Sequence, residues 1–337
     1  MIMRTKLWML GVAVAALTSC TQSEVVEIPE NRVIGFDTFV ENDSRAVAAD
    51  VNISTITNFH VFGYNQSGNE TSWETVFNNV DVTYQNNAWT YSPTKYWQTN
   101  HNYRFAAYAD GLNSEKNNNV AYNAATDKLT ITDYNAGFKD LIASISGDIT
   151  TGATVSSPMV PLSFKHMLTK IGFHFYANTK TVIKISNVEI DNAFTAGTAT
   201  YTYSDHKIAW DTTGKSKSTY TENNDDETLL STTLTEYAFY VIPQSNAEVK
   251  VKFILHTYDS TNAEIETIPY TASLATGGIH TDVTNTWKVG YFYKYYVTFG
   301  ESFEATPIQF TVNAVDGWNN ATDTQGTPID PSENTGN

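Results

Sequence analysis

The hydrophobic and polar positions of this chain alternate with a period of two over much of its length. Ile171, Phe173 and Phe175 share one side of a strand-like segment, and Lys170 and His174 share the other side. Such alternation predicts a strand with one buried and one more polar face, as in an antiparallel sandwich. We therefore expect strands here rather than helices.

Similar strand-like runs recur along the chain, separated by loops rich in Asn and Gly. These runs are residues 33–40, 59–64, 80–84, 103–109, 141–146, 249–255, 287–299 and 308–315. Beyond the N-terminal segment, no stretch shows helical periodicity over about 12 residues. The pattern predicts an all-β protein built from antiparallel β-sandwiches.

The order of these runs also suggests a division of the chain. The loop 147–158 is rich in Ser, Thr and Gly, and strand patterns resume after it. We therefore expect two domains, residues 46–160 and residues 161–318, at a size typical of single domains. The last segment, 319–337, is polar with almost no apolar residues, which predicts a disordered tail.

The N-terminus has the pattern of a secretion signal. Basic residues precede the apolar run 7–17, which is shorter than the about 20 residues that a bilayer span needs. We expect residues 1–19 to be removed and residues 20–45 to form a tether and a first strand. Residues 17–20 read Leu-Thr-Ser-Cys and resemble the lipobox of bacterial lipoproteins, which implies acylation of Cys20. The alternative is a plain secretory signal with an incidental cysteine.

The composition narrows the classes of function. The chain has 36 acidic against 20 basic residues and a net charge of −16. Such a charge argues against nucleic acid and anionic lipid surfaces as partners. Cys20 is the only cysteine, so the chain forms no internal disulfide and no cysteine-based metal or redox site. The fold must be held by its hydrophobic core.

Motifs that carry chemistry are weak in this sequence. Residues 209–216 fit a loose phosphate-loop pattern, but the first glycine is missing and the following residues are poor helix formers, which favours a hairpin turn. The acidic run 223–227 is either a Ca²⁺ site or a solvated surface. The seven histidines show no paired metal-ligand spacing, and no Gly-x-Ser-x-Gly motif is present. We expect no catalytic residues, no metal and no cofactor.

Aromatic residues crowd the segment from residue 73 to residue 97. Trp89 and Trp97 are candidates for stacking on a glycan, with Trp73, Tyr91 and Tyr96 nearby in the sequence. In an all-β chain without disulfides, core packing is the competing use of such rings. Both interpretations remain open at this stage.

Several short motifs follow one another in a recognisable order. They are residues 34–39, the Ser-Arg-Ala of 44–46, the Tyr-Trp of 96–97, and residues 103–108, 139–143, 161–171, 287–295 and 315–318. The most specific is Leu-x-Phe-x-His-x-Leu at 162–168. Together with the lipobox, this ordered set resembles the fimbrillins, the type V pilins and accessory subunits that gut and oral anaerobes make as lipoproteins.

The resemblance implies two transthyretin-like sandwiches and a particular mode of assembly. In pilins of this family an Arg-directed protease cuts after the first strand, and the matching bond here joins Arg45 to Ala46. Loss of the first strand opens a groove that a strand from another subunit fills. Alternatively, Arg45 is an ordinary surface arginine. Because the tail is polar, either residues 308–315 are the donor strand or this is a tip or accessory subunit.

We therefore expect a non-enzymatic structural or adhesive subunit of a surface fimbria. The expected partners are other subunits through strand exchange, the outer membrane through lipid on Cys20, and a host or bacterial surface ligand. The alternative function is a glycan-binding outer-membrane lipoprotein that uses Trp89 and Trp97.

Overall fold

A computed structural model describes residues 32–40, 56–68, 70–154, 158–177, 179–222, 227–233, 235–275, 285–299 and 310–315. Every extended regular element in these ranges is a β-strand, which confirms the predicted all-β class. In the same ranges, no helix has the length and apolarity needed to cross a bilayer. Cys20, Arg45, Ala46 and the tail 319–337 lie outside the described residues, so the predictions made for them stay predictions.

The first sheet has eight strands and contains the N-terminal strand at one end. Its order is β1-β10-β8-β5-β2-β3-β4, and β9 pairs with β5. The strands are β1 (Gly35–Val40), β2 (Asn58–Ser67), β3 (Glu74–Gln85), β4 (Ala88–Thr90), β5 (His101–Asp110), β8 (Leu141–Ile145), β9 (Ile149–Thr150) and β10 (Met159–His166).

A second sheet of four strands packs on the first. Its order is β14-β13-β7-β6. The strands are β6 (Val120–Asn123), β7 (Lys128–Asn135), β13 (Ala196–Thr202) and β14 (Lys207–Asp211). A shared cluster of buried side chains joins the two sheets, with Phe62 and Ala106 from the first and Leu129, Ala199 and Tyr201 from the second.

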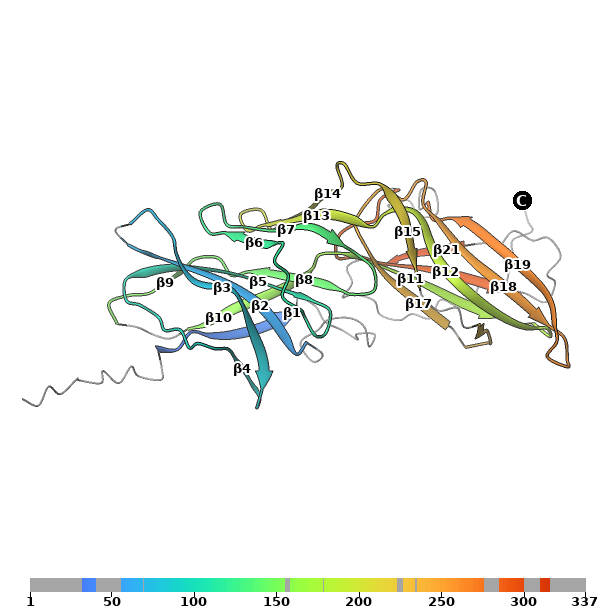
Figure 1. Ribbon diagram of the computed structural model, residues 1–337, viewed down its shortest axis with the longest axis horizontal. Coiled ribbons are helices and arrows are strands. Elements are labelled where there is room, and N and C mark those ends of the chain that lie inside the picture. The colour runs from blue at the N-terminus through green and yellow to red at the C-terminus, as the bar shows by residue number, and fades with distance from the viewer. Residues whose placement is uncertain are drawn as a thin grey trace, which may run out of the picture.

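The second sheet combines segments that lie far apart in the sequence. The β13–β14 hairpin follows residue 160, yet Ala199 pairs with Ile131 and Tyr201 pairs with Leu129 on β7. Figure 1 shows this hairpin beside β6 and β7, above the first sheet. The predicted domain boundary near residue 160 is not tested by this pairing and stays a prediction.

Two further sheets form the other end of the elongated molecule (Figure 1). One has the order β17-β11-β20-β21, and the other has the order β15-β12-β18-β19 with β16 paired to β12. Their strands are β11 (Thr169–Ala177), β12 (Val182–Phe194), β15 (Lys217–Thr221), β16 (Thr228–Leu229), β17 (Thr235–Val241), β18 (Lys250–Tyr258), β19 (Glu264–Ser273), β20 (Phe292–Phe299) and β21 (Phe310–Val315).

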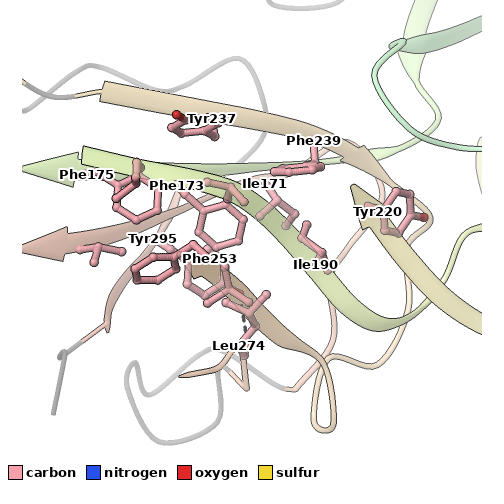
Figure 2. Packing of buried hydrophobic residues seen from close by; sticks show 14 of the residues in the cluster. Ile171, Phe173, Phe175, Ile190, Tyr220, Tyr237, Phe239, Phe253, Leu274 and Tyr295 are labelled. Atoms are coloured by element: carbon pink, nitrogen blue, oxygen red, sulfur yellow. Dashed lines mark hydrogen bonds between the residues drawn. The ribbon is translucent and has the colours of Figure 1, made fainter. Parts of the chain in front are cut away.

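The core of this end lies between its two sheets. Figure 2 shows Phe173, Phe239 and Tyr295 of the β17-β11-β20-β21 sheet packed toward Phe253 of the β15-β12-β18-β19 sheet. Trp287, which is fully buried, donates from its indole Nε1 to the Tyr295 hydroxyl at 3.0 Å. Without a disulfide, burial of large aromatic side chains is the main source of stability here.

Strand β11 departs from the expected division into one buried and one polar face. Ile171, Phe173 and Phe175 are buried as predicted, but Lys170 and His174 are also only 1% and 6% exposed. The reason is the neighbouring strand β20, whose aromatic rings cover this second face. The Lys170 ammonium lies 4.6 Å from the centre of the Phe292 ring, and His174 stacks on Tyr296 at 4.9 Å.

Two strand pairs are parallel rather than antiparallel as expected. Strand β1 pairs with β10, and β11 pairs with β20, both in parallel. Each pair joins segments separated by more than a hundred residues, and such a long connection allows the chain to return in the same direction. The remaining pairs of named strands are antiparallel in the described part of the chain.

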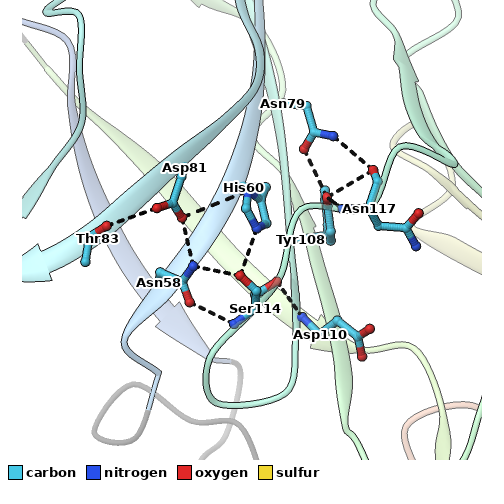
Figure 3. Close-up of polar contacts among 9 residues, drawn as sticks. All are labelled: Asn58, His60, Asn79, Asp81, Thr83, Tyr108, Asp110, Ser114 and Asn117. Atoms are coloured by element: carbon cyan, nitrogen blue, oxygen red, sulfur yellow. Dashed lines mark hydrogen bonds and ion pairs between the residues drawn. The ribbon is translucent and has the colours of Figure 1, made fainter.

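A polar network fastens the loop after β5 to the first sheet (Figure 3). The Asn58 side-chain amide donates to the Ser114 carbonyl and to Asp81 Oδ1, each at 2.8 Å. The buried His60 ring also reaches the Ser114 carbonyl, with Nε2 at 3.0 Å. The Asp110 backbone amide donates to the Ser114 hydroxyl at 3.0 Å. These bonds satisfy polar groups that would otherwise be costly to bury.

Candidate functional site

The N-terminal segment 32–40 contacts two parts of the molecule, the segment 95–97 and strand β10, and this contact region is called the seam. Before β1 begins, the Ile34 amide donates to the Lys95 carbonyl at 3.0 Å, and the Trp97 amide donates to the Arg32 carbonyl at 2.8 Å. From Gly35 onward, the same strand pairs in parallel with β10. The chain segment 32–40 therefore has backbone partners on two separate parts of the molecule.

The centre of the seam is the side chain of Phe36. It is 2% exposed, and its ring lies 5.7 Å from the rings of Phe59, Phe77 and Tyr91 and 6.2 Å from that of Phe105. The ring planes meet at steep angles, which is a favourable edge-to-face arrangement. Phe36 thus fills an aromatic socket that the other strands of the sheet build.

Two polar side chains from the opposite end of the sheet also hold the first strand. The Tyr91 hydroxyl donates to the Ile34 carbonyl at 2.7 Å, and the Trp89 indole Nε1 donates to Thr38 Oγ1 at 2.9 Å. Burial raises the pKa of the Tyr91 hydroxyl, so it remains a neutral donor at physiological pH. Through these bonds the β4 end of the sheet curls back onto β1.

The wall beside β1 comes from the motif at residues 162–168. Leu162 and Phe164 are at most 1% exposed and belong to the same core cluster as Phe36. His166 places Nδ1 2.9 Å from Asp140 Oδ2, with both side chains buried. The motif therefore lines a groove that the first strand occupies.

The two tryptophans that were candidates for glycan contact are also part of this region. Trp97 is 2% exposed and packs edge-on against Tyr103 with the ring centres 4.6 Å apart, so its ring has no exposed face for a sugar. Glycan contact at Trp97 does not fit this position, because the ring is used in the core. Trp89 is half-buried against Phe59 at 4.9 Å and Tyr84 at 5.0 Å, and its predicted glycan contact stays a prediction.

A separate open cleft of about 650 Å³ lies between the β2–β3 loop and the β6–β7 hairpin. Its aromatic lining comes from Tyr64, Trp73 and Tyr122, and its rim is polar. Trp73 lies in the aromatic-rich segment 73–97, but only Trp89 and Trp97 of that segment were predicted to contact a glycan. No spacing signal joins Trp73 to Tyr122, because they come from separate parts of the chain.

A fixed cation supports the Trp73 side of this cleft. The Arg104 guanidinium lies 4.9 Å from the centre of the Trp73 ring. Arg104 pairs with Asp148 and donates from Nη1 to the Ala124 carbonyl at 2.6 Å. The hydrogen bond to Asp148 raises the pKa of Arg104, so the charge is permanent. The Arg104 guanidinium thus lies over the Trp73 ring beside the open space.

The other predicted motifs have the following positions. Residues 209–216 comprise the end of β14 and the loop that leads to β15, and β15 is a strand where a phosphate loop requires a helix. The turn is not a hairpin, because β14 and β15 belong to different sheets. Of the acidic run 223–227, only Glu227 is described.

The C-terminal edge contains the strand considered as a donor. Residues 308–315 include β21, which pairs antiparallel with β20 from Phe310 to Val315 and is the last strand in its sheet. Within the described residues, its backbone therefore has one strand neighbour.

Comparisons with known proteins match most of the chain. The model of a family described as fimbrillin-like matches residues 44–316. No curated protein matches the chain. A solved fimbrial protein from Bacteroides vulgatus is 19% identical, with 86% of this chain and 100% of that chain covered and a TM-score of 0.54. A putative cell adhesion protein from Bacteroides uniformis is 17% identical, with 84% and 98% covered and a TM-score of 0.46.

Proposed function

Because this chain belongs to the fimbrillin-like family, we propose that it is a non-enzymatic structural or adhesive subunit of a bacterial surface fimbria. The observation that carries the proposal is the groove filled by the segment 32–40. This segment is held by backbone pairing on two sides and by the socket around Phe36. A single segment of this kind is suited to replacement by an equivalent strand from another molecule.

Assembly would then follow removal of the first strand. Arg45 follows β1 closely in the sequence, and a cut between Arg45 and Ala46 separates β1 from the rest of the chain. The loss exposes the edge of β10 and the buried side chains of Phe59, Phe77 and Phe105. An exposed edge with an apolar face is a template for strand addition. A donor strand from a neighbouring subunit fills the groove.

The N-terminal signal supports a surface location before assembly. The Leu-Thr-Ser-Cys order at 17–20 favours acylation of Cys20 and anchoring in the outer membrane. Several acyl chains together hold a protein that one chain would hold only marginally. The cut after Arg45 would release the subunit from this anchor and prepare it for the fimbria in the same step.

We also propose that the four sheets represent two transthyretin-like sandwiches, with residues 46–160 and 161–318 as their main segments. Three clusters of buried residues support a division into more than one core. The β13–β14 hairpin would then be an element that the second segment contributes to the first sandwich.

The N-terminal residue of the mature surface protein tests both processing steps. In fimbriae sheared from cells, mass spectrometry is expected to find Ala46 as the first residue. In the membrane fraction, the precursor is expected to begin at acylated Cys20. The Arg45→Ala variant should accumulate as the acylated precursor and should be missing from fimbriae, because its groove remains filled by its own strand.

The Arg45→Lys variant provides the matched control, since it keeps the positive charge but removes the guanidinium that an Arg-directed protease recognises. It should behave like Arg45→Ala. If fimbriae contain chains that begin at Cys20, or if both variants assemble normally, the cleavage step is wrong. If the protein never enters fimbriae, the fimbrial assignment itself fails.

The cleft beside Trp73 favours a second candidate function, glycan binding. Aromatic faces with a polar rim are the usual composition of a site for a small polar ligand. On a panel of oligosaccharides, the intact protein should bind at least one member, and Trp73→Ala should weaken that binding about tenfold, since a stacked aromatic contributes about 0.5–1.5 kcal/mol beyond its buried area.

Tyr84→Ala is the control for this measurement, because Tyr84 is an aromatic residue 48% exposed on β3 and outside the cleft. It should bind as the unmodified protein does. A loss of binding in Trp89→Ala but not in Trp73→Ala would place the glycan at Trp89 instead. Absence of any binding would remove the glycan-binding function.

A further inference from the structure

Three residues of types that commonly bind metal ions lie close together outside the groove and the cleft. Glu227 precedes β16, His256 lies on β18, and Glu264 begins β19. Strand β12 pairs with both β16 and β18, and β18 pairs with β19, so the sheet itself brings the three residues into proximity. One ligand atom from each lies within 4.8 Å of the others.

The imidazole of His256 is oriented by a partner on each side. Its Nε2 lies 2.9 Å from the hydroxyl of Ser186, which is 5% exposed on β12. Its Nδ1 lies 2.9 Å from Glu264 Oε1 and 3.6 Å from Glu227 Oε1. When Nε2–H donates to Ser186, Nδ1 retains its lone pair and directs it toward both carboxylates. A metal-binding histidine typically has such a partner at its second nitrogen.

The two carboxylates are oriented as well. Glu227 accepts hydrogen bonds at Oε2 from the Lys184 ammonium, at 3.0 Å, and from the Tyr258 hydroxyl, which leaves Oε1 on the His256 side. Glu264 Oε1 accepts from the Thr267 hydroxyl. These hydrogen bonds fix the orientation of the two carboxylates beside the imidazole.

A proton on Nδ1 can form a hydrogen bond to only one of the two carboxylates. It bonds to Glu264, but the 3.6 Å separation from Glu227 Oε1 is beyond a hydrogen bond. A divalent cation binds imidazole nitrogen and carboxylate oxygen at about 2.0–2.2 Å and draws all three atoms together. The imidazole favours Zn²⁺ over Ca²⁺ or Mg²⁺, which prefer oxygen ligands alone.

We propose that Glu227, His256 and Glu264 form a Zn²⁺ site on the surface of the β12-β18-β19 sheet. Water completes the coordination, because three protein ligands leave at least one position open. Ser186 is a positioning residue for the imidazole, and Lys184 and Tyr258 position Glu227. The bound ion connects β19, which is the edge strand of its sheet, to β18 and to the segment before β16.

Isothermal titration of the mature chain with ZnCl₂, after removal of metal with a chelator, tests this site. One equivalent of Zn²⁺ should bind, and the thermal unfolding midpoint should rise with Zn²⁺ concentration, since a ligand that binds the folded state stabilises it. His256→Gln should weaken binding at least about a hundredfold, and Ser186→Ala should weaken it about 10–100-fold, as is typical of residues that orient a ligand.

Glu266→Gln is the matched control, because Glu266 is exposed on the same strand as Glu264 and lies outside the group. Glu264→Gln should weaken Zn²⁺ binding, whereas Glu266→Gln removes the same charge and should leave Zn²⁺ affinity unchanged. Circular dichroism without metal should show that each variant is folded. The proposal is overturned if Zn²⁺ does not bind, if His256→Gln binds Zn²⁺ as tightly as the unmodified protein, if Glu266→Gln weakens binding as much as Glu264→Gln, or if Ca²⁺ binds in preference to Zn²⁺.

Discussion

A chain that begins at Ala46 is expected to lose more than about 5 kcal/mol of folding free energy relative to the chain that retains the first strand. Burial of a Phe side chain accounts for about 3–5 kcal/mol and that of an Ile for about 2–5 kcal/mol. Phe36 and Ile34 are both removed, together with the parallel pairing to β10. Because domains are stable by only about 5–15 kcal/mol, the effect should be large in a thermal or urea unfolding experiment.

Addition of a synthetic peptide with the sequence of residues 32–40 is expected to restore much of this stability. The peptide provides the same backbone partners and the ring that fills the socket between Phe59, Phe77 and Phe105. A peptide with Phe36→Asp is the control and should not bind, because it would bury a charge among aromatic rings. If the shortened chain is as stable as the longer one, or if both peptides act alike, the groove is not a strand-binding site.

Phe253→Ala is expected to destabilise the other end of the molecule by about 3–5 kcal/mol. Phe253 is 2% exposed, and its ring lies 5.2 Å from Phe175 and 5.4 Å from Tyr270. Truncation leaves a cavity that the surrounding rigid strands fill only in part. Urea unfolding followed by tryptophan fluorescence measures the change.

Ile265→Ala serves as the comparison, because Ile265 is 63% exposed on β19 and should change stability by no more than about 0.5 kcal/mol. Since Phe253 and Phe36 belong to different clusters, Phe253→Ala should also leave the affinity for the first-strand peptide unchanged at temperatures where the protein is folded. Equal loss in both variants would mean that burial is not the source of the effect.

The sequence predicts the individual strands well, but it predicts poorly which distant segments contact one another. The alternation at residues 170–176 correctly indicates strand β11, because period-two patterning depends only on neighbouring residues. It does not indicate that Lys170 and His174 are covered, because the rings of Phe292 and Tyr296 come from a strand more than a hundred residues later. The parallel pairing of β1 with β10 is hidden for the same reason.

The candidate sites were also hard to predict, because their residues come from segments far apart in the sequence or differ in burial. The crowding of tryptophans is visible in the sequence, but burial separates Trp97 in the core from Trp73 at a cleft. The group of Glu227, His256 and Glu264 has no linear spacing typical of metal ligands. His256 and Glu264 meet through the β18–β19 turn, and Glu227 joins them only because β16 and β18 share β12 as a neighbour. Such proximity follows from topology rather than from sequence spacing.

The β13–β14 hairpin has a consequence for how the protein is made. Strand β7 leaves the ribosome well before Ala196–Thr202, the strand with which it pairs. During synthesis its edge therefore has no partner on that side, and the core that includes Leu129 and Ile131 cannot close until the hairpin has emerged. Non-local pairing of this kind folds slowly. The delay lengthens the time during which the new polypeptide is incompletely folded, with the edge of β7 still open on one side.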